Sequence, residues 1–248
     1  MLFSLSIVFA AGLWAGLQNT LAGGGSFITL PALILSGMSP LAANITSTIA
    51  LFPGQVTSAW AGRSLVTGAG KLSFKSLFIL SIIGGALGGV LLLNTPSQIF
   101  ARLVPWLVLF ATMVFTWGNF FRKPGSEHLH LGAASTAVAQ FLIAVYGGYF
   151  GGGIGFLMLA ALTMAGVATR NAGATKNVLA AAMNASAVLL FVLSPQVQWP
   201  QAIALAAGAM GGALAGSQML HKVNENILRI AIVVLGAALT IGLFLRPL

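Results

Sequence analysis

Two glycine-interrupted apolar stretches, 129 positions apart, constrain the fold of this chain more than any other feature. Each break leaves an apolar segment, 25–37 in the first copy and 154–167 in the second, that would reach only about 20 Å as a helix, whereas the hydrocarbon core of a bilayer is about 30 Å thick. An internal duplication with a broken helix in each half is typical of transporters. Five pairs of identical residues fix the alignment: Gly24 and Gly153, Phe27 and Phe156, Gly37 and Gly166, Ala43 and Ala172, and Thr46 and Thr175.

The composition predicts an all-α polytopic membrane protein. Hydrophobic residues make up 58% of the 248 positions and charged residues only 5%, whereas a soluble domain carries about 25% charge. We expect ten helical segments, at about 2–21, 25–37, 41–61, 76–94, 103–121, 131–150, 154–167, 171–193, 200–219 and 227–245.

The duplication extends over the whole chain. The run Gly84–Gly89 reappears as Gly211–Gly216, now shifted by 127 positions. We therefore predict a first transmembrane repeat at 1–121, a linker at 122–130 and a second repeat at 131–248, with five segments in each repeat. Because five is odd, the two repeats should have inverted topology if every segment crosses. Segment 2–21 is interpreted as structural rather than as a cleaved leader, because its partner 131–150 lies deep in the chain.

The charged residues indicate orientation and exclude several kinds of chemistry. Eleven Lys and Arg against two Glu give a formal charge of +9, and most of the basic residues fall in four loop regions, including the linker. By the positive-inside rule these loops are cytoplasmic, so the charge does not indicate nucleic-acid binding. The chain has no Asp and no Cys, and the predicted segments contain no Glu or His. This argues against an enzyme, and we expect neither a cofactor nor a metal site.

The glycine breaks are the predicted binding site. Irregular backbone at membrane depth must face protein or a water-filled cavity, and a helix that restarts after a break directs its N–H groups and positive dipole end at the gap. Two opposed restarts near the midplane would attract an anion. The alternative is that these glycines only permit close packing. The candidate residues are Gly23, Gly24, Gly25 and Ser26 in the first copy and Gly151, Gly152 and Gly153 in the second.

Polar residues in the third and eighth segments complete the candidate site. Gln55 and Asn184 are repeat equivalents, so an amide recurs in the middle of both segments. Such groups also hydrogen-bond neighbouring helices, which is the alternative role. Lys176, whose equivalent is Ser47, lies about six residues inside its segment; it would either bind an anion or extend its ammonium to the interface. The full candidate set here is Asn44, Thr46, Ser47, Gln55, Thr175, Lys176, Asn177 and Asn184.

The arrangement of these motifs resembles the TauE/SafE sulfite exporter family, also called the TSUP family of anion transporters. The resemblance rests on Gly16–Gly25 followed by Phe27 and Pro31, on the run Pro40–Ser47, on Gly151–Gly153 with Asn171–Asn177, and on Gly84–Gly89. The chain has Asn44-Ile45-Thr46-Ser47 where the family commonly has Gly-Thr-Ser. The resemblance implies a multi-pass carrier in the bacterial inner membrane for sulfite, sulfonates or related small organosulfur or carboxylate anions.

We therefore expect a transporter that moves a small organic or organosulfur anion by alternating access. Export is favoured if no other ion is coupled, because each negative charge that leaves a negative interior gains about 2.3 kcal/mol per 100 mV. Two other hypotheses remain open: a channel-like pore for anions or small solutes, and a membrane assembly factor whose polar groups only join helices. The expected partners are the anionic solute and the lipid bilayer, and a homo-oligomer stays open.

Overall fold

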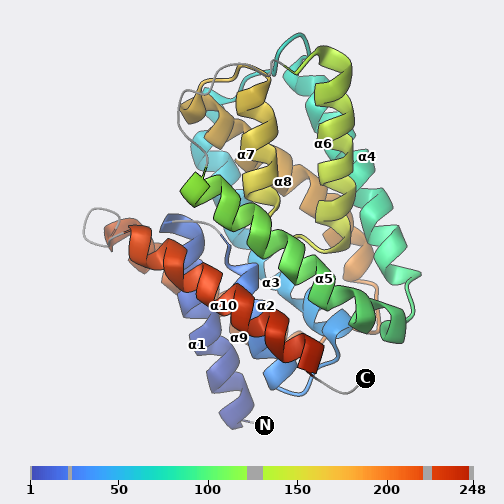
Figure 1. The fold of residues 1–248 in the computed structure, drawn as a ribbon. Helices are drawn as coiled ribbons and strands as arrows, with labels where there is room; N and C mark the ends of the chain where they lie inside the picture. The colour runs from blue at the N-terminus through green and yellow to red at the C-terminus, as the bar shows by residue number, and fades with distance from the viewer. Residues whose placement is uncertain (1, 22–23, 122–130, 220–224, 246–248) are drawn as a thin grey trace. The chain divides into compact units, whose positions relative to one another are not determined.

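Ten α-helices form the fold in a computed structural model, which describes residues 2–21, 24–121, 131–219 and 225–245 (Figure 1). Each predicted apolar segment corresponds to one helix, so the all-α prediction is confirmed. Gly23 and the predicted linker 122–130 lie outside the described residues. The helices are α1 (Leu2–Leu21), α2 (Ser26–Leu35), α3 (Pro40–Gly62), α4 (Phe74–Leu93), α5 (Ser97–Thr116), α6 (Ala133–Tyr149), α7 (Ile154–Met164), α8 (Thr169–Phe191), α9 (Trp199–Met219) and α10 (Glu225–Leu245), with a 3₁₀ turn η1 (Arg63–Leu65) and a π-helical stretch η2 (Trp117–Phe121).

The two short segments fold as the two short helices of the chain's described part. Helix α2 has 10 residues and α7 has 11, so each is about 15–17 Å long, roughly half the thickness of the hydrocarbon core. Among the described residues, three helices are both long enough and apolar enough to cross a membrane by themselves: α4, α5 and α8.

Repeat-equivalent glycines have the same backbone conformation at both ends of the short helices. Before α2 and α7, Gly24 has φ 84° and Gly153 has φ 73°. After these helices, Gly37 has φ 97° and Gly166 has φ 85°. Side chains with a Cβ rarely adopt positive φ, so glycine is needed at these positions. The glycines that align in the sequence therefore perform the same turn in each copy.

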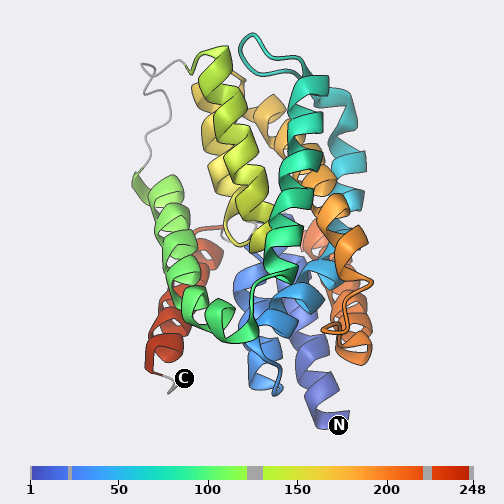
Figure 2. The same ribbon diagram turned by 90° about the vertical axis from the view of Figure 1, so that its right-hand side faces the viewer.

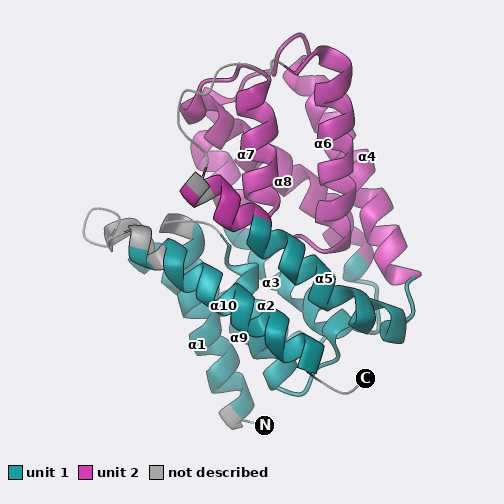
Figure 3. Cartoon of the chain, viewed as in Figure 1, with its two compact units in different colours: residues 1–54, 95–113, 191–248 teal, residues 55–94, 114–190 magenta. Residues whose placement is uncertain are grey.

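Two compact units divide the chain, and each takes helices from both halves of the sequence (Figure 3). Unit 1 contains residues 1–54, 95–113 and 191–248, which include α1, α2, α9 and α10. Unit 2 contains residues 55–94 and 114–190, which include α4, α6, α7 and α8. The unit boundaries thus differ from the repeat boundaries predicted from the sequence.

In unit 1, α1 and α9 pack together closely enough for their backbones to touch. A Cβ on Gly16 would overlap the carbonyl group of Ala209, and a Cβ on Gly212 would overlap that of Leu13. Small residues four apart on each helix make this approach possible, which is the usual basis of helix association in membranes. Helix α1 also contacts α2, and α2 contacts α10.

In unit 2, α4 and α6 pack in the same manner (Figure 2). Cβ atoms on Gly84 and Gly88 would collide with α6, and one on Gly148 would overlap the carbonyl group of Gly85. A buried hydrogen bond from Gln140 Nε2 to Ser81 Oγ, 2.8 Å long, joins the two helices beside these glycines. The side chains of Leu77, Met158, Leu162, Leu179 and Met183 form much of the apolar core.

These two packed pairs are related by the sequence repeat. Helix α6 is the repeat equivalent of α1, and α4 is the repeat equivalent of α9. The first helix of each copy therefore packs against the fourth helix of the other copy. Glycines of the two runs that align in the sequence, among them Gly84, Gly88 and Gly212, serve this helix contact in both cases.

Exposed basic residues lie in or beside the loops of unit 2 that hydrogen bonds join to one another. The Leu131 N–H donates to the Met164 carbonyl over 3.0 Å, and Asn171 Nδ2 donates to the Leu65 carbonyl over 3.1 Å, so these loops are joined. Positive-inside reasoning predicts this grouping for the loops of a cytoplasmic face. The basic residues are Arg63, Lys71, Lys75 and Arg170.

Candidate functional site

The start of α7 is an uncapped helix N-terminus beside a lysine. Gly153 precedes the helix with left-handed backbone, and no side chain caps the first turn. The N–H groups of Phe156 and Leu157 both use the Gly153 carbonyl, so the N–H groups before them lie at the positive end of the helix dipole. Gly151 also has positive φ, and Gly152 is buried between the two.

Lys176 extends from α8 to this helix start. A methyl group on Gly155 would lie 3.6 Å from the Lys176 Nζ, so the ammonium group lies against the first turn of α7. The lysine is half-buried, and the two acidic residues of the chain, Glu127 and Glu225, belong to none of the helices α6, α7 and α8. A positive side chain and a positive helix end therefore adjoin, and an anion placed between them would stabilise both.

The start of α2, the repeat equivalent, has different partners. The Gly25 N–H donates to Asn19 Oδ1 over 2.7 Å, so an amide oxygen of α1 already occupies the N–H before the helix. Ser47, which stands where the second copy has Lys176, shares a 2.6 Å hydrogen bond with Thr29 Oγ1 of α2. Ser26, the first residue of α2, is half-buried. The start of α2 therefore has hydroxyl and amide groups beside it where the start of α7 has a lysine.

The two repeat-equivalent amides are in direct contact. Asn184 Nδ2 of α8 donates to Gln55 Oε1 of α3 over 2.7 Å, and the two positions differ by 129 in the sequence. Asn184 is only 2% exposed. Its Oδ1 is buried and has no hydrogen-bond partner in the structure.

The two repeat-equivalent threonines, Thr46 and Thr175, form hydrogen bonds with the backbone of loops. Thr175 Oγ1 accepts from the Thr67 N–H at 3.0 Å and lies 3.3 Å from the Thr67 carbonyl oxygen, to which it donates. Thr46 Oγ1 accepts from the Gln198 N–H over 3.2 Å. Each threonine lies in one copy and binds the loop that precedes the fourth helix of the other copy. Both hydroxyls thus have backbone partners, which corresponds to the alternative, structural role of such groups.

The remaining candidates are two asparagines. Asn44 of α3 is buried, at 4% exposed, and its carbonyl accepts a 2.9 Å hydrogen bond from Thr48 Oγ1. Asn177 follows Lys176 on α8 and is half-buried. The sequence alone does not show which groups the side chains of Asn44 and Asn177 contact.

The structure therefore divides the candidate residues between the two units. Unit 1 holds Gly24, Gly25, Ser26, Asn44, Thr46 and Ser47, and unit 2 holds Gln55, Gly151, Gly152, Gly153, Thr175, Lys176, Asn177 and Asn184. Sequence reasoning did not select Asn19 or Gly155. Asn19 lies near the first break, but its contact with Gly25 depends on how the chain turns back, and Gly155 matters only because it leaves room for the lysine.

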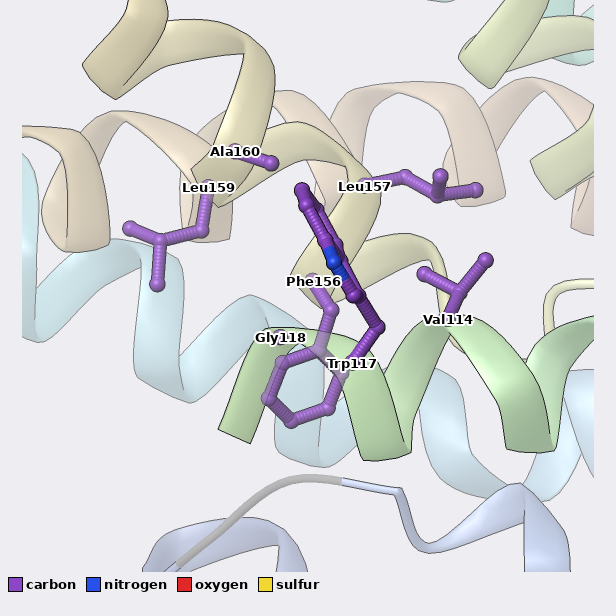
Figure 4. A pocket seen from close by; sticks show the side chains of 7 residues that line it. All are labelled: Val114, Trp117, Gly118, Phe156, Leu157, Leu159 and Ala160. Carbon is purple, nitrogen blue, oxygen red and sulfur yellow. The ribbon is translucent and has the colours of Figure 1, made fainter. Parts of the chain in front are cut away.

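A mainly apolar pocket of unit 2 lies between residues of α7 and the stretch from Val114 to Gly118 (Figure 4). The ring of Trp117 stands beside Phe156, and Phe156 packs edge-on against Phe115 with ring centroids 4.4 Å apart. The cavity has a volume of about 120 Å³ and is lined mainly by hydrocarbon, with no charged residue among its lining residues, so it offers little that would bind an anion. The lining residues are Val114, Trp117, Gly118, Phe156, Leu157, Leu159 and Ala160.

Comparison with known proteins shows the family of this chain. The family described as sulfite exporter TauE/SafE matches residues 8–243. A probable membrane transporter protein of Haemophilus influenzae is 30% identical over 242 residues, which cover 95% of this chain and 92% of the relative. The probable membrane transporter protein YfcA of Escherichia coli is 27% identical over 240 residues, which cover 95% and 88%. These relatives are membrane transporters and not enzymes. The chain therefore belongs to the sulfite exporter TauE/SafE family.

Proposed function

We propose that this protein transports a small organosulfur or related organic anion, such as sulfite or a sulfonate, across the bacterial inner membrane by alternating access. The observation that carries the proposal is the Lys176 ammonium against the uncapped start of α7. A positive side chain beside a positive helix end forms a site that favours a negative solute, and the sequences of α6, α7 and α8 contain no acidic residue. The family assignment supports transport, and the chemistry of this site supports an anion.

Reciprocal contacts between the copies support alternating access. Helix α1 packs on α9 as α6 packs on α4, and Thr46 and Thr175 each hold a loop of the other copy. Gln55 and Asn184 contact one another directly. When two copies are related by a two-fold axis, equivalent residues that contact one another lie at that axis, and inverted repeats place substrate sites near such an axis at the membrane midplane. We therefore assign Gln55 and Asn184 to the repeat interface and the repeats to inverted topology.

Within unit 2, we assign the anion to the start of α7. Gly151–Gly153 supplies the backbone, Lys176 the charge, and Asn177 a neighbouring amide. We place Gly24, Gly25 and Ser26 in a secondary role in this conformation, because Asn19 Oδ1 already accepts from the Gly25 N–H. Thr46 and Thr175 are expected to maintain the loops rather than touch the solute.

The test uses purified protein in proteoliposomes loaded with sulfite or a simple sulfonate. Lys176→Met should lower anion flux at least tenfold, because it removes the charge and keeps the length of the side chain. Lys71→Met, which changes an exposed loop lysine in the same unit, should leave flux unchanged. Native flux and affinity in Lys176→Met would contradict the role of this lysine, and single-channel currents would contradict alternating access.

The same vesicles test the direction of transport. If one monoanion moves without a coupled ion, a potential of 100 mV contributes about 2.3 kcal/mol, which is about a 50-fold difference in the equilibrium ratio across the membrane. The solute should therefore accumulate on the positive side of a potassium diffusion potential. An accumulation ratio that does not respond to the potential would argue against uncoupled export.

A further inference from the structure

The contact between Gln55 and Asn184 leaves one hydrogen-bonding capacity unmet. Asn184 Nδ2 donates to Gln55 Oε1 over 2.7 Å, but Asn184 Oδ1 accepts nothing and is buried. Asn184 is 2% exposed, whereas Gln55, at the other end of the hydrogen bond, is half-buried. A buried carbonyl oxygen without a donor costs about 1–3 kcal/mol, and native proteins seldom leave one without a reason.

The geometry of the amide pair defines what would complete it. If the two amides paired in a closed ring, Asn184 Oδ1 would accept from Gln55; it does not, so only one of the two possible bonds is made. Whichever amide donates in that bond, the other two groups of the pair, one carbonyl oxygen and one NH₂ group, take no part in it. A ligand group that fits both must donate one hydrogen bond and accept another. A hydroxyl does so, whereas a deprotonated oxyanion can only accept.

We propose that the Gln55–Asn184 pair binds a hydroxyl group of the transported solute, so that the protein prefers small anions that carry an O–H donor in addition to their anionic group. This inference rests on the proposed anion transport. Asn184 lies eight residues after Lys176 on α8, about 12 Å along the helix axis. The pair is therefore a contact separate from the lysine on the same helix, and a solute as small as 2-hydroxyethanesulfonate meets the two contacts in turn.

The preference for hydroxylated anions depends on Asn184 Oδ1, the acceptor that has no donor. A hydroxylated anion donates to Asn184 Oδ1, whereas an anion without a donor leaves this oxygen without a hydrogen bond. A site that is built to hydrogen-bond a hydroxyl rejects analogues that lack it, because its own polar groups are then left without partners. One such bond is worth about tenfold in affinity.

The test compares two sulfonates of nearly equal size in proteoliposomes: 2-hydroxyethanesulfonate, which has the donor, and ethanesulfonate, which lacks it. Half-saturation concentrations and flux are measured for both solutes. The native protein should prefer the hydroxylated sulfonate at least tenfold. In Asn184→Leu the ratio of the two half-saturation concentrations should fall to about one. Gln140→Leu, which removes a buried amide whose Nε2 bonds Ser81, should keep the native preference.

Three outcomes separate the two proposals. Equal transport of both sulfonates by the native protein overturns the hydroxyl preference and leaves anion transport standing. If Asn184→Leu keeps the native preference, another group binds the hydroxyl, which also overturns its assignment to the Gln55–Asn184 pair. Failure of the native protein to bind or move either sulfonate, or sulfite, refutes the proposed function and the inference with it. If Asn184→Leu does not fold, the exchanged pair Gln55→Asn with Asn184→Gln should retain the preference, and its loss there counts against the pair.

Discussion

Replacing Gly84 with alanine should separate α4 from α6, while the same change at Gly173 should not disturb its neighbours. Both glycines lie in helices of unit 2. A Cβ on Gly84 would lie 2.6 Å from the Ala144 Cβ and 2.9 Å from the Phe141 carbonyl oxygen. A Cβ on Gly173 would meet no atom within 4 Å. The two substitutions therefore add the same methyl group to a closed and to an open environment.

The expected energies follow from these distances. Carbon atoms in ordinary contact are about 3.5–4.0 Å apart, so relieving the contact with Ala144 requires the two helices to move by about 1 Å. Such overpacking costs about 1–3 kcal/mol. The gain in helix propensity from glycine to alanine offsets at most about 1 kcal/mol. We expect a net destabilisation of about 1–2 kcal/mol for Gly84→Ala, and for Gly173→Ala a stabilisation of up to about 1 kcal/mol.

The measurement is reversible unfolding of the purified protein in mixed micelles with increasing sodium dodecyl sulfate, followed by circular dichroism. The two free energies of unfolding should differ by about 2 kcal/mol, with Gly84→Ala the less stable variant. Equal stabilities, or a lower stability for Gly173→Ala, would refute the claim that carbonyl and methyl contacts at Gly84 hold α4 and α6 together.

Two further substitutions test the turns and the loops. Gly166→Ala should destabilise the protein by about 1–2 kcal/mol through backbone strain alone, because Gly166 has φ 85° and open space around it; an unchanged free energy of unfolding would contradict this. Thr175→Val should cost about 1–3 kcal/mol, because it removes both hydrogen bonds with Thr67. The affinity for the transported anion should stay native in that variant, and a selective loss of affinity would instead place the hydroxyl in contact with the solute.

The sequence predicted the helices well because hydropathy acts locally. A run of about 20 apolar residues has few alternatives to a helix in a membrane, since each backbone N–H and C=O must find its partner within the segment. The breaks at the glycines could also be predicted from the sequence, because positive φ at Gly24 and Gly153 depends on single residues and their neighbours. The duplication then made each such feature appear twice, which distinguished it from chance.

The contacts between segments that are distant in the sequence could not be predicted from the sequence alone. The sequence identified Gln55 and Asn184 as equivalent amides, but only the packing of α3 and α8 places them 2.7 Å apart and leaves one oxygen without a donor. Likewise, the sequence shows that Lys176 places a charge in an apolar segment at a cost in free energy. Only the tertiary structure brings its ammonium to the start of α7.

The sequence by itself determined that this protein is a duplicated bundle of apolar helices with a break in each half, because those properties depend on residue type and spacing along the chain. Only the tertiary structure decided that each compact unit combines helices from both halves, and that the two helix starts have different partners: an amide oxygen at Gly25 and a lysine at Gly155. The physical reason is that such partners are chosen by close packing between distant segments, where a single glycine or carbonyl decides which surfaces can meet.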